Sequence, residues 1–311
     1  MAKYILKRVL MALVTVFVVA SLTFFLMKAV PGNPYIGEKS PPPSVVAAIT
    51  AKYGLDRPKI EQYGIYMGNL LKGDLGESVK LGKGRPVIDI ITTMFPTSAK
   101  IGAIALSWAV VVGVLLGCVS AYNRGKAADS ALRVVCTVGI SMPSFVVATL
   151  LLLLLCGAGK PFPTLFDAEL WQSYVLPCGA LGLYPMCYIA RQTRTSMLDA
   201  LNQEYIKTAR AKGLATPRIV LKHALRNALI PVLTYLGPQI AFTLCGGFVV
   251  ETVFTIPGLG RYFVQSITAR DYPVIMGTTI FLAAFVILMN LLVDLLYKVV
   301  DPRINLGKEN G

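Results

Sequence analysis

Long runs of apolar residues, separated by short polar connections, dominate the sequence. Six of these runs are long enough to cross about 30 Å of hydrocarbon as an α-helix. They cover residues 9–30, 97–122, 134–157, 174–190, 229–250 and 274–293. The pattern predicts an all-α membrane protein with about six transmembrane helices, of which the fourth is the shortest.

The composition agrees with this pattern, and the charge adds to it. Of the 311 residues, 55% are hydrophobic and 15% are charged, and the formal net charge is +14. A basic excess of this size is found in nucleic-acid-binding proteins, but a multi-span membrane protein also retains Lys and Arg on its cytoplasmic side. We therefore expect contact with the lipid bilayer and no nucleic-acid binding.

The distribution of Lys and Arg predicts the orientation of the chain. With a cytoplasmic N-terminus, the cytoplasmic segments hold 17 of these residues, whereas the short outer connections hold only Lys160, Arg261 and Arg270. The long segment after the first run is left out, because long segments cross the membrane largely regardless of charge. Both termini are therefore expected in the cytoplasm. The first run is longer than the core of a signal peptide and should be retained as a span.

The segment between the first two runs, residues 31–96, has a pattern of its own. Ser44 and Gly54 predict the two ends of a short helix, and Pro58 and Gly73 predict those of a second, amphipathic helix. The uneven apolar face of the second helix consists of Ile60, Tyr63, Ile65, Tyr66 and Leu70. We expect a small extracytoplasmic helical segment that packs on the membrane domain, since about 60 residues rarely form a stable core alone. It either contacts an external partner or is a structural plug.

Motifs of catalysis and of cofactor binding are missing from the sequence. No phosphate-binding loop of the form G-x-x-x-x-G-K-[ST] occurs, and the single histidine, His223, excludes an H-E-x-x-H zinc site. The six cysteines lie in or beside apolar runs without C-x-x-C spacing, so we interpret them as apolar packing residues. We expect no catalytic residue, no metal site and no cofactor in this chain.

Ionisable residues inside a membrane mark ion or proton pathways. The acidic residues nearest the predicted spans are Glu251 and Asp294, and both lie at span ends. A proton-coupled secondary transporter would depend on one of these two residues, and a membrane enzyme would depend on His223.

A basic strip, EYIKTARAKGLATPRIVLKHALRNALIP at residues 204–231, separates the fourth and fifth runs. Residues 203–212 suit a helix, Gly213 is typical of a helix end, and Thr216 with Pro217 is typical of the start of a second helix that runs toward Asn227. Small residues in the strip permit the close approach of a soluble protein. The pattern predicts a cytoplasmic hairpin that grips such a partner. The alternatives are a charged loop that binds lipid headgroups and a passive scaffold that tolerates substitution.

The strip resembles the cytoplasmic coupling loop, or EAA loop, of the permease subunits of bacterial ABC importers. TARAKGL followed by HALRNALIPVLT is similar to the form in dipeptide and oligopeptide importers, and Gly213 matches the central glycine of the loop. Lys207 stands where the loop usually has a glutamate. The stretches AVPGNPY, ETVFTIPGLGRYFVQSITARDYPVIMG and DPRINL extend the resemblance over nearly the whole chain. It is strongest to the first of the two permease subunits of oligopeptide importers.

The resemblance implies a domain organisation. The first transmembrane helix would cover residues 1–30 and the extracytoplasmic segment residues 31–96. The core importer domain would cover residues 97–298, with its coupling loop at residues 191–228, and a cytoplasmic tail would follow at residues 299–311. The residues that couple to the ATPase would be Lys207, Ala209, Ala211, Lys212, Gly213, Leu214 and Ala215.

The resemblance also implies partners, cargo and location. The partners would be a second homologous permease, two cytoplasmic ATPase subunits that hold the ATP and Mg²⁺, and an extracytoplasmic peptide-binding protein. The cargo would be oligopeptides or dipeptides, carried across the bacterial plasma membrane. Nickel and glutathione importers share these motifs, so a nickel chelate or glutathione stays open as the cargo. A proton-coupled secondary peptide transporter is the alternative from another class.

Overall fold

The computed structural model describes residues 2–30, 54, 56–157 and 159–300, and within these ranges the chain is helical, with turns and no strand. The predicted all-α fold class is confirmed. The chain divides into two compact units. Unit 1 consists of Met1–Pro96 and Pro257–Leu288, and unit 2 consists of Thr97–Ile256 and Met289–Gly311.

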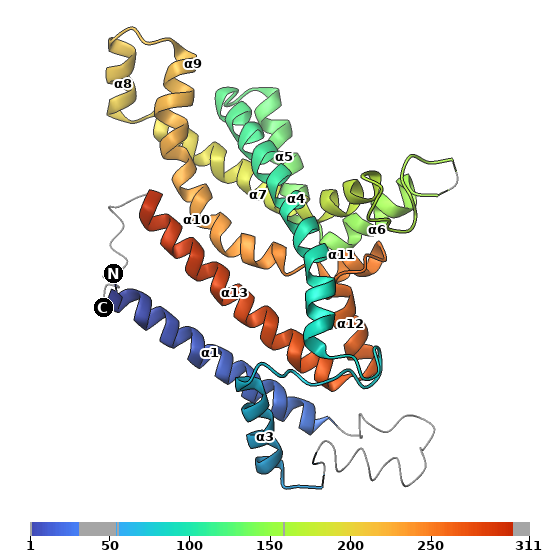
Figure 1. The fold of residues 1–311 in the computed structure, drawn as a ribbon. Helices are drawn as coiled ribbons and strands as arrows, with labels where there is room; N and C mark the ends of the chain where they lie inside the picture. The colour runs from blue at the N-terminus through green and yellow to red at the C-terminus, as the bar shows by residue number, and fades with distance from the viewer. Residues whose placement is uncertain (1, 31–53, 55, 158, 301–311) are drawn as a thin grey trace. The chain divides into compact units, whose positions relative to one another are not determined.

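Unit 1 contains α1 (Ala2–Ala29), α3 (Lys59–Leu71), the start of α4 (Val87–Tyr122), α12 (Leu259–Ala269) and most of α13 (Tyr272–Val300) (Figure 1). Aromatic rings join α1 to α3, since Phe24 stacks on Tyr66 with ring centroids 5.3 Å apart and Phe25 stacks on Tyr63 at the same distance. The Phe95 ring of α4 likewise meets Phe281 of α13 at 4.9 Å.

The helix predicted after Pro58 is confirmed. Residue Pro58 is the N-cap of α3, and Gly73, two residues after the end of the helix, has a φ of +80°. The predicted apolar face is only partly correct, because Tyr63, Tyr66 and Leu70 are half-buried whereas Ile60 and Ile65 are exposed. The helix predicted to begin at Ser44 lies outside the described residues.

A buried carboxylate holds the connection before α4 within unit 1. Asp271 is fully buried between α12 and α13 and accepts a hydrogen bond of 2.6 Å from the Ser78 hydroxyl. The same carboxylate accepts from the backbone N–H groups of Val79, Lys80 and Leu81 at 3.1, 2.9 and 3.0 Å. Four donors therefore converge on one side chain that is about 190 residues distant in sequence.

Unit 2 is built around α7 (Gln172–Leu201), against which α5 (Ala127–Ser141), α6 (Ser144–Leu155) and α10 (Leu225–Leu244) all pack. Its other elements are α8 (Glu204–Ala211), α9 (Thr216–Arg218), the π-helical turn η1 (Ile219–Ala224) and α11 (Phe248–Val253). The larger part of α4, from Thr97 onward, and the end of α13 also belong to unit 2. The six cysteines are all free, and all but Cys118 are buried, in agreement with their interpretation as packing residues.

The helices differ most from the second, third and fourth predicted spans. The second span begins at Val87 rather than at residue 97, so Pro96 lies inside α4. The predicted third span is instead two helices, α5 and α6, which meet at an angle of 103°. The fourth span is a helix of 30 residues, because α7 continues past residue 190 as far as Leu201.

The bend between α5 and α6 has a local cause. Pro143 disfavours helical backbone at the residue before it, and Met142 accordingly has φ −82° and ψ 123°, an extended conformation. Within the described ranges, five helices are long and apolar enough to cross a membrane, or six if α5 and α6 together count as one span. The expected number of about six agrees with this result.

Candidate functional site

The basic strip forms a helical hairpin in unit 2, which extends beyond the ends of α7 and α10 (Figure 1). Its first helix, α8, covers Glu204–Ala211 and so is one residue shorter at each end than the predicted range of 203–212, because Gln203 is an extended N-cap and Lys212 is the C-cap. The turn has the hydrogen bonds of a Schellman motif, in which the Gly213 N–H donates to the Arg210 carbonyl at 2.9 Å and the Leu214 N–H to the Ala209 carbonyl at 3.3 Å. The left-handed conformation expected for Gly213 is confirmed by its φ of +69°.

The second half of the hairpin is less regular than predicted. Instead of one continuous helix toward Asn227, α9 covers only Thr216–Arg218 and passes into the π-helical turn η1, which α10 follows. A π-helical turn inserts an extra residue, and such turns are frequent at functional sites. The single histidine, His223, lies half-buried in this turn.

An apolar cluster fixes the hairpin to the long helices of unit 2. Ile206 and Ala209 of α8 are buried in it, together with Ile219 and Ala224 of η1. The cluster also contains buried residues from α4, α7 and α10, namely Ala121, Met197, Ala200 and Ala228. A hydrogen bond of 2.9 Å from the Asn227 side-chain amide to the Tyr205 hydroxyl adds a polar connection between α10 and α8. The hairpin is therefore packed directly against α4, α7 and α10.

The seven residues expected to couple to the ATPase separate into two groups. Ala209 is buried, and Leu214 packs against the same apolar cluster, so these two face the body of unit 2. The other five are exposed, and they are Lys207, Ala211, Lys212, Gly213 and Ala215. The exposed Lys207 makes an ion pair of 2.7 Å with Glu204, one turn earlier in the same helix.

Four of the five exposed residues, Ala211, Lys212, Gly213 and Ala215, lie at the turn that forms the tip of the hairpin, whereas Lys207 lies in the middle of α8. Arg210, Pro217 and Arg218 lie beside this turn and are also exposed. The sequence analysis did not select these three, although two of them are basic and stand in the same strip. The tip thus presents small side chains between positive charges, an arrangement that suits an acidic recess on a soluble protein.

A second feature that the sequence analysis missed is a buried ion pair close to the hairpin. Asp129, in the first turn of α5, is 1% exposed, and its carboxylate binds Arg194 of α7. The Ser120 hydroxyl and the Gly125 N–H also donate to this carboxylate, at 2.6 and 3.0 Å. Arg194 lies two turns before Leu201, where α7 ends and the hairpin begins. The sequence did contain a signal for this ion pair, because Asp129 is an acidic residue among the basic residues that follow the second span.

The two acidic residues considered for proton coupling have different positions. Glu251 lies in α11 and is 1% exposed, so it is buried within the protein rather than facing solvent. Asp294 lies in the part of α13 whose side chains are not described. Within the described ranges, no group of three or more His, Cys, Asp or Glu residues is arranged to hold a metal ion.

Comparisons with known proteins identify the family. A family model for the binding-protein-dependent transport system inner membrane component matches residues 113–306, and a model for the N-terminal part of such membrane components matches residues 1–101. The chain is 45% identical over 312 residues to the dipeptide transport system permease protein DppB of Bacillus subtilis (strain 168), with 99% of this chain and 100% of that protein covered. It is 42% identical over 309 residues to the oligopeptide transport system permease protein OppB of Haemophilus influenzae, with 98% and 99% covered.

Among solved structures, a chain of the MetNI methionine ABC transporter is similar over 68% of this chain and 97% of its own length, with 16% identity and a TM-score of 0.49. The sequence matches carry the assignment, because the first family model alone spans more than half of the chain and both relatives cover it almost from end to end. The chain belongs to the family of inner membrane components of binding-protein-dependent transport systems.

Proposed function

We propose that this chain is a permease subunit of an ATP-driven importer that carries dipeptides or oligopeptides across the bacterial plasma membrane. The observation that carries the proposal is the full-length similarity to permeases named for dipeptide and oligopeptide transport, at 45% and 42% identity. In this function the chain supplies half of the translocation path, and a second, homologous permease supplies the other half.

The hairpin of α8 and α9 would be the contact with an ATPase subunit. Its exposed tip, with Ala211, Lys212 and Gly213, would enter a recess of the ATPase, while the buried Ala209 and the adjoining Leu214 keep the tip attached to the apolar cluster. Closure of two ATPase subunits on ATP would then move α7 and α10 as rigid bodies and change access to the path. ATP and Mg²⁺ would bind in the ATPase subunits and not in this chain.

The orientation follows from the distribution of Lys and Arg. Both termini and the hairpin would be cytoplasmic, and the segment of residues 31–96 would face the other side, where a peptide-binding protein delivers the cargo. This arrangement puts the tip of the hairpin, with its exposed Arg210, Lys212 and Arg218, on the side that contains ATP.

The proposal is tested by purifying the tagged chain from native membranes and identifying its stoichiometric partners by mass spectrometry. We expect a second permease and ATPase subunits, and ATP hydrolysis that rises when binding protein loaded with a tripeptide is added. Recovery of the chain alone, together with peptide uptake into vesicles that lack ATP, would favour a secondary transporter instead. Uptake of a nickel chelate or of glutathione, without uptake of peptides, would retain the importer and change its cargo.

A further inference from the structure

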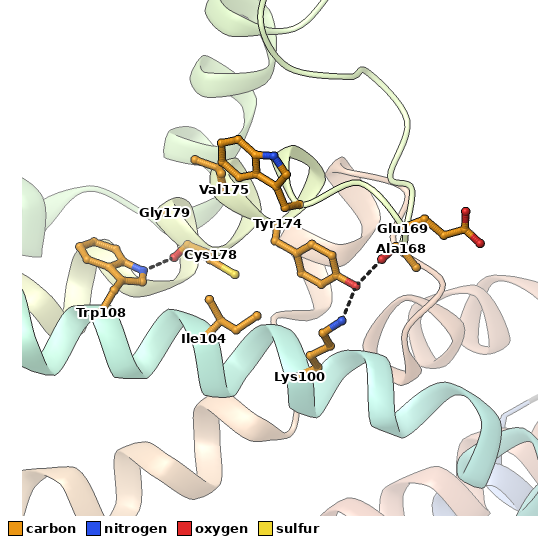
Figure 2. A pocket seen from close by; sticks show the side chains of 10 residues that line it. Lys100, Ile104, Trp108, Ala168, Glu169, Tyr174, Val175, Cys178 and Gly179 are labelled. Atoms are coloured by element: carbon orange, nitrogen blue, oxygen red, sulfur yellow. Dashed lines mark hydrogen bonds between the residues drawn. The ribbon is translucent and has the colours of Figure 1, made fainter.

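A cavity of about 720 Å³ lies in unit 2 between α4, the start of α7 and the connection that precedes α7 (Figure 2). Figure 2 shows Lys100 and Trp108 of α4 toward opposite ends of it, with Ile104 between them. Val175 and Cys178 of α7 line it as well. Lys100 and Trp108 are eight residues apart in one helix, which corresponds to about 12 Å along the axis.

The polar groups of the cavity are concentrated at the Lys100 end. The Lys100 ammonium donates a hydrogen bond of 3.0 Å to the Tyr174 hydroxyl and lies 4.5 Å from the centre of that ring. The Tyr174 hydroxyl donates in turn to the Ala168 carbonyl at 3.1 Å. An ammonium group has three N–H donors, so Lys100 can bind an anion while it keeps its bond to Tyr174.

The Trp108 end of the cavity is apolar. The Trp108 indole N–H donates to the Cys178 carbonyl at 2.9 Å, so the donor of this side chain is already satisfied by backbone. From Ile104 in the cavity toward the C-terminal end of α4, the surface stays apolar, and Ile104, Val111, Leu115 and Val119 are 40%, 60%, 59% and 48% exposed. Spacings of seven, four and four residues keep these side chains on one face of the helix.

We propose that this cavity binds an anionic phospholipid of the surrounding bilayer, with the phosphate on Lys100 and an acyl chain along Ile104, Trp108 and the apolar face of α4. From Ile104 to Val119 this face extends about 22 Å, which is longer than half of the roughly 30 Å hydrocarbon thickness. Trp171 and Tyr174 of the cavity lie at the start of the α7 span, and Tyr and Trp side chains at the end of a span are characteristic of the bilayer interface. The long side chain of Lys100 can extend its ammonium toward the same interface.

The apolar wall of the cavity favours a lipid over a peptide as the occupant. A peptide lying along Ile104 and Trp108 would leave its backbone amides without hydrogen-bond partners against an apolar wall, which is costly, whereas an acyl chain has no polar groups to satisfy. The acidic side chain at the rim, Glu169, is exposed, and Figure 2 shows its carboxylate pointing away from Lys100. The ammonium of Lys100 is therefore the charged group that the headgroup of an incoming lipid would contact.

The fluorescence of the tryptophans can report directly on lipid binding in the cavity. The sequence contains two, Trp108 and Trp171, and both line the cavity. The full chain is reconstituted in nanodiscs of zwitterionic phosphatidylcholine, and brominated phosphatidylglycerol or brominated phosphatidylcholine is titrated in while tryptophan fluorescence is recorded. Bromine quenches only tryptophans that it approaches closely. We expect half-maximal quenching at an about five-fold lower mole fraction of the anionic lipid, the preference that one lysine near the surface provides.

The variants separate a lipid site from a general affinity for anions. We expect Lys100→Gln to remove the preference, Lys100→Arg to keep it, and Lys83→Gln, at an exposed lysine outside the cavity, to leave it unchanged. Circular dichroism checks that each variant is folded. Equal quenching by the two lipids in the unsubstituted chain would overturn the proposal. Relief of the quenching by an added tripeptide would also overturn it and would assign the cavity to the peptide path.

Discussion

Arg194 of α7 and Asp129 of α5 form a two-point ion pair, in which Nε lies 2.7 Å from Oδ1 and Nη2 lies 2.8 Å from Oδ2. The pair fixes the beginning of α5 to the part of α7 that precedes the hairpin. Asp129 is 1% exposed, so water does not replace a lost partner. The pair therefore connects α5 to the part of α7 that lies nearest the hairpin.

We expect Arg194→Ala to destabilise the protein strongly, by about 3 kcal/mol, because it removes the two-point partner of a buried carboxylate. The ion pair that remains, with the more exposed Arg133, is longer, at 3.7 Å. The change is measured as the loss of monodisperse protein on heating in detergent. The control is Arg191→Ala, since Arg191 is an exposed arginine of the same helix. Equal thermal stability of the two variants would show that the pair contributes little. The double variant Arg194→Leu with Asp129→Leu should recover much of the loss, because it removes both charges.

Close packing between α4 and α7 supports a second prediction. A Cβ atom at Gly117 would lie 2.5 Å from the Thr193 Cβ and 2.6 Å from the Ala190 carbonyl oxygen. Gly113, four residues earlier, faces α7 in the same way, with the Met186 carbonyl oxygen 2.8 Å from the position of its Cβ. The two glycines form a G-x-x-x-G motif, which lets membrane helices approach closely.

We expect Gly117→Ala to cost about 1–3 kcal/mol, because backbone on α7 must move to accept the methyl group. The matched control is Gly179→Ala in α7, where a Cβ atom meets nothing within 4 Å. That substitution should be neutral or slightly stabilising, since alanine favours a helix over glycine. Thermal stability in detergent compares the two variants, and a lower stability of Gly179→Ala than of Gly117→Ala would contradict this account of the packing.

The sequence was sufficient for features that depend on local physics and insufficient for those that depend on packing. Apolar runs predicted the long helices, and Gly213 and Pro58 predicted a turn and a helix start, because the preferences of glycine and proline act within a few residues. The bend at Pro143 has an equally local cause, but the apolar run continues through it, so the pattern suggested one span. In contrast, the burial of Ala209 and the pairing of Asp129 with Arg194 depend on segments brought together by the fold.

The convergence of four donors on Asp271 predicts that this carboxylate orders the connection before α4. We expect Asp271→Ala to cost about 3 kcal/mol, since hydrogen bonds to a charged acceptor are stronger than neutral ones and the Ser78 hydroxyl would stay buried without its acceptor. Hydrogen exchange of the peptide that contains Val79, Lys80 and Leu81 measures the effect locally and should become much faster. The control is Asp74→Ala, an exposed residue of the same connection that accepts one hydrogen bond, from the Gly76 N–H. If both variants exchange alike, Asp271 does not have this role.

Substitutions at Gly213 can distinguish an effect on the conformation of the hairpin from an effect on its contact with a partner. A Cβ atom at this position meets nothing within 4 Å in this chain, so a substitution is opposed only by the left-handed backbone, at a cost of about 1 kcal/mol. Asparagine tolerates this backbone conformation better than other non-glycine residues. We therefore expect Gly213→Asn to preserve the fold, and Gly213→Val to disturb the turn.

Under the proposed function, both variants should lose peptide uptake, because even the asparagine side chain would occupy space that the ATPase needs. Uptake of a labelled tripeptide into cells measures this, and the amount of ATPase that co-purifies shows whether docking has failed. Full uptake by Gly213→Val would refute a close contact at the tip of the hairpin. Loss of uptake by Gly213→Val alone would limit the role of the glycine to the shape of the turn.

The positive charge at the tip of the hairpin supports the last prediction. Lys212 is the C-cap of α8 and is exposed next to Gly213, whereas Lys222 is exposed in η1, two elements further along the chain. If the tip enters an acidic recess, Lys212→Glu should weaken ATPase docking by about ten-fold or more, because like charges across an interface repel. Lys222→Glu makes the same change in net charge away from the tip and should have a smaller effect.

The dissociation constant is measured with purified ATPase and the permease in nanodiscs at low and high salt. The difference between the two variants should shrink at high salt, since salt screens exposed charges, and equal effects of the two substitutions at low salt would mean that the tip is not the docking surface.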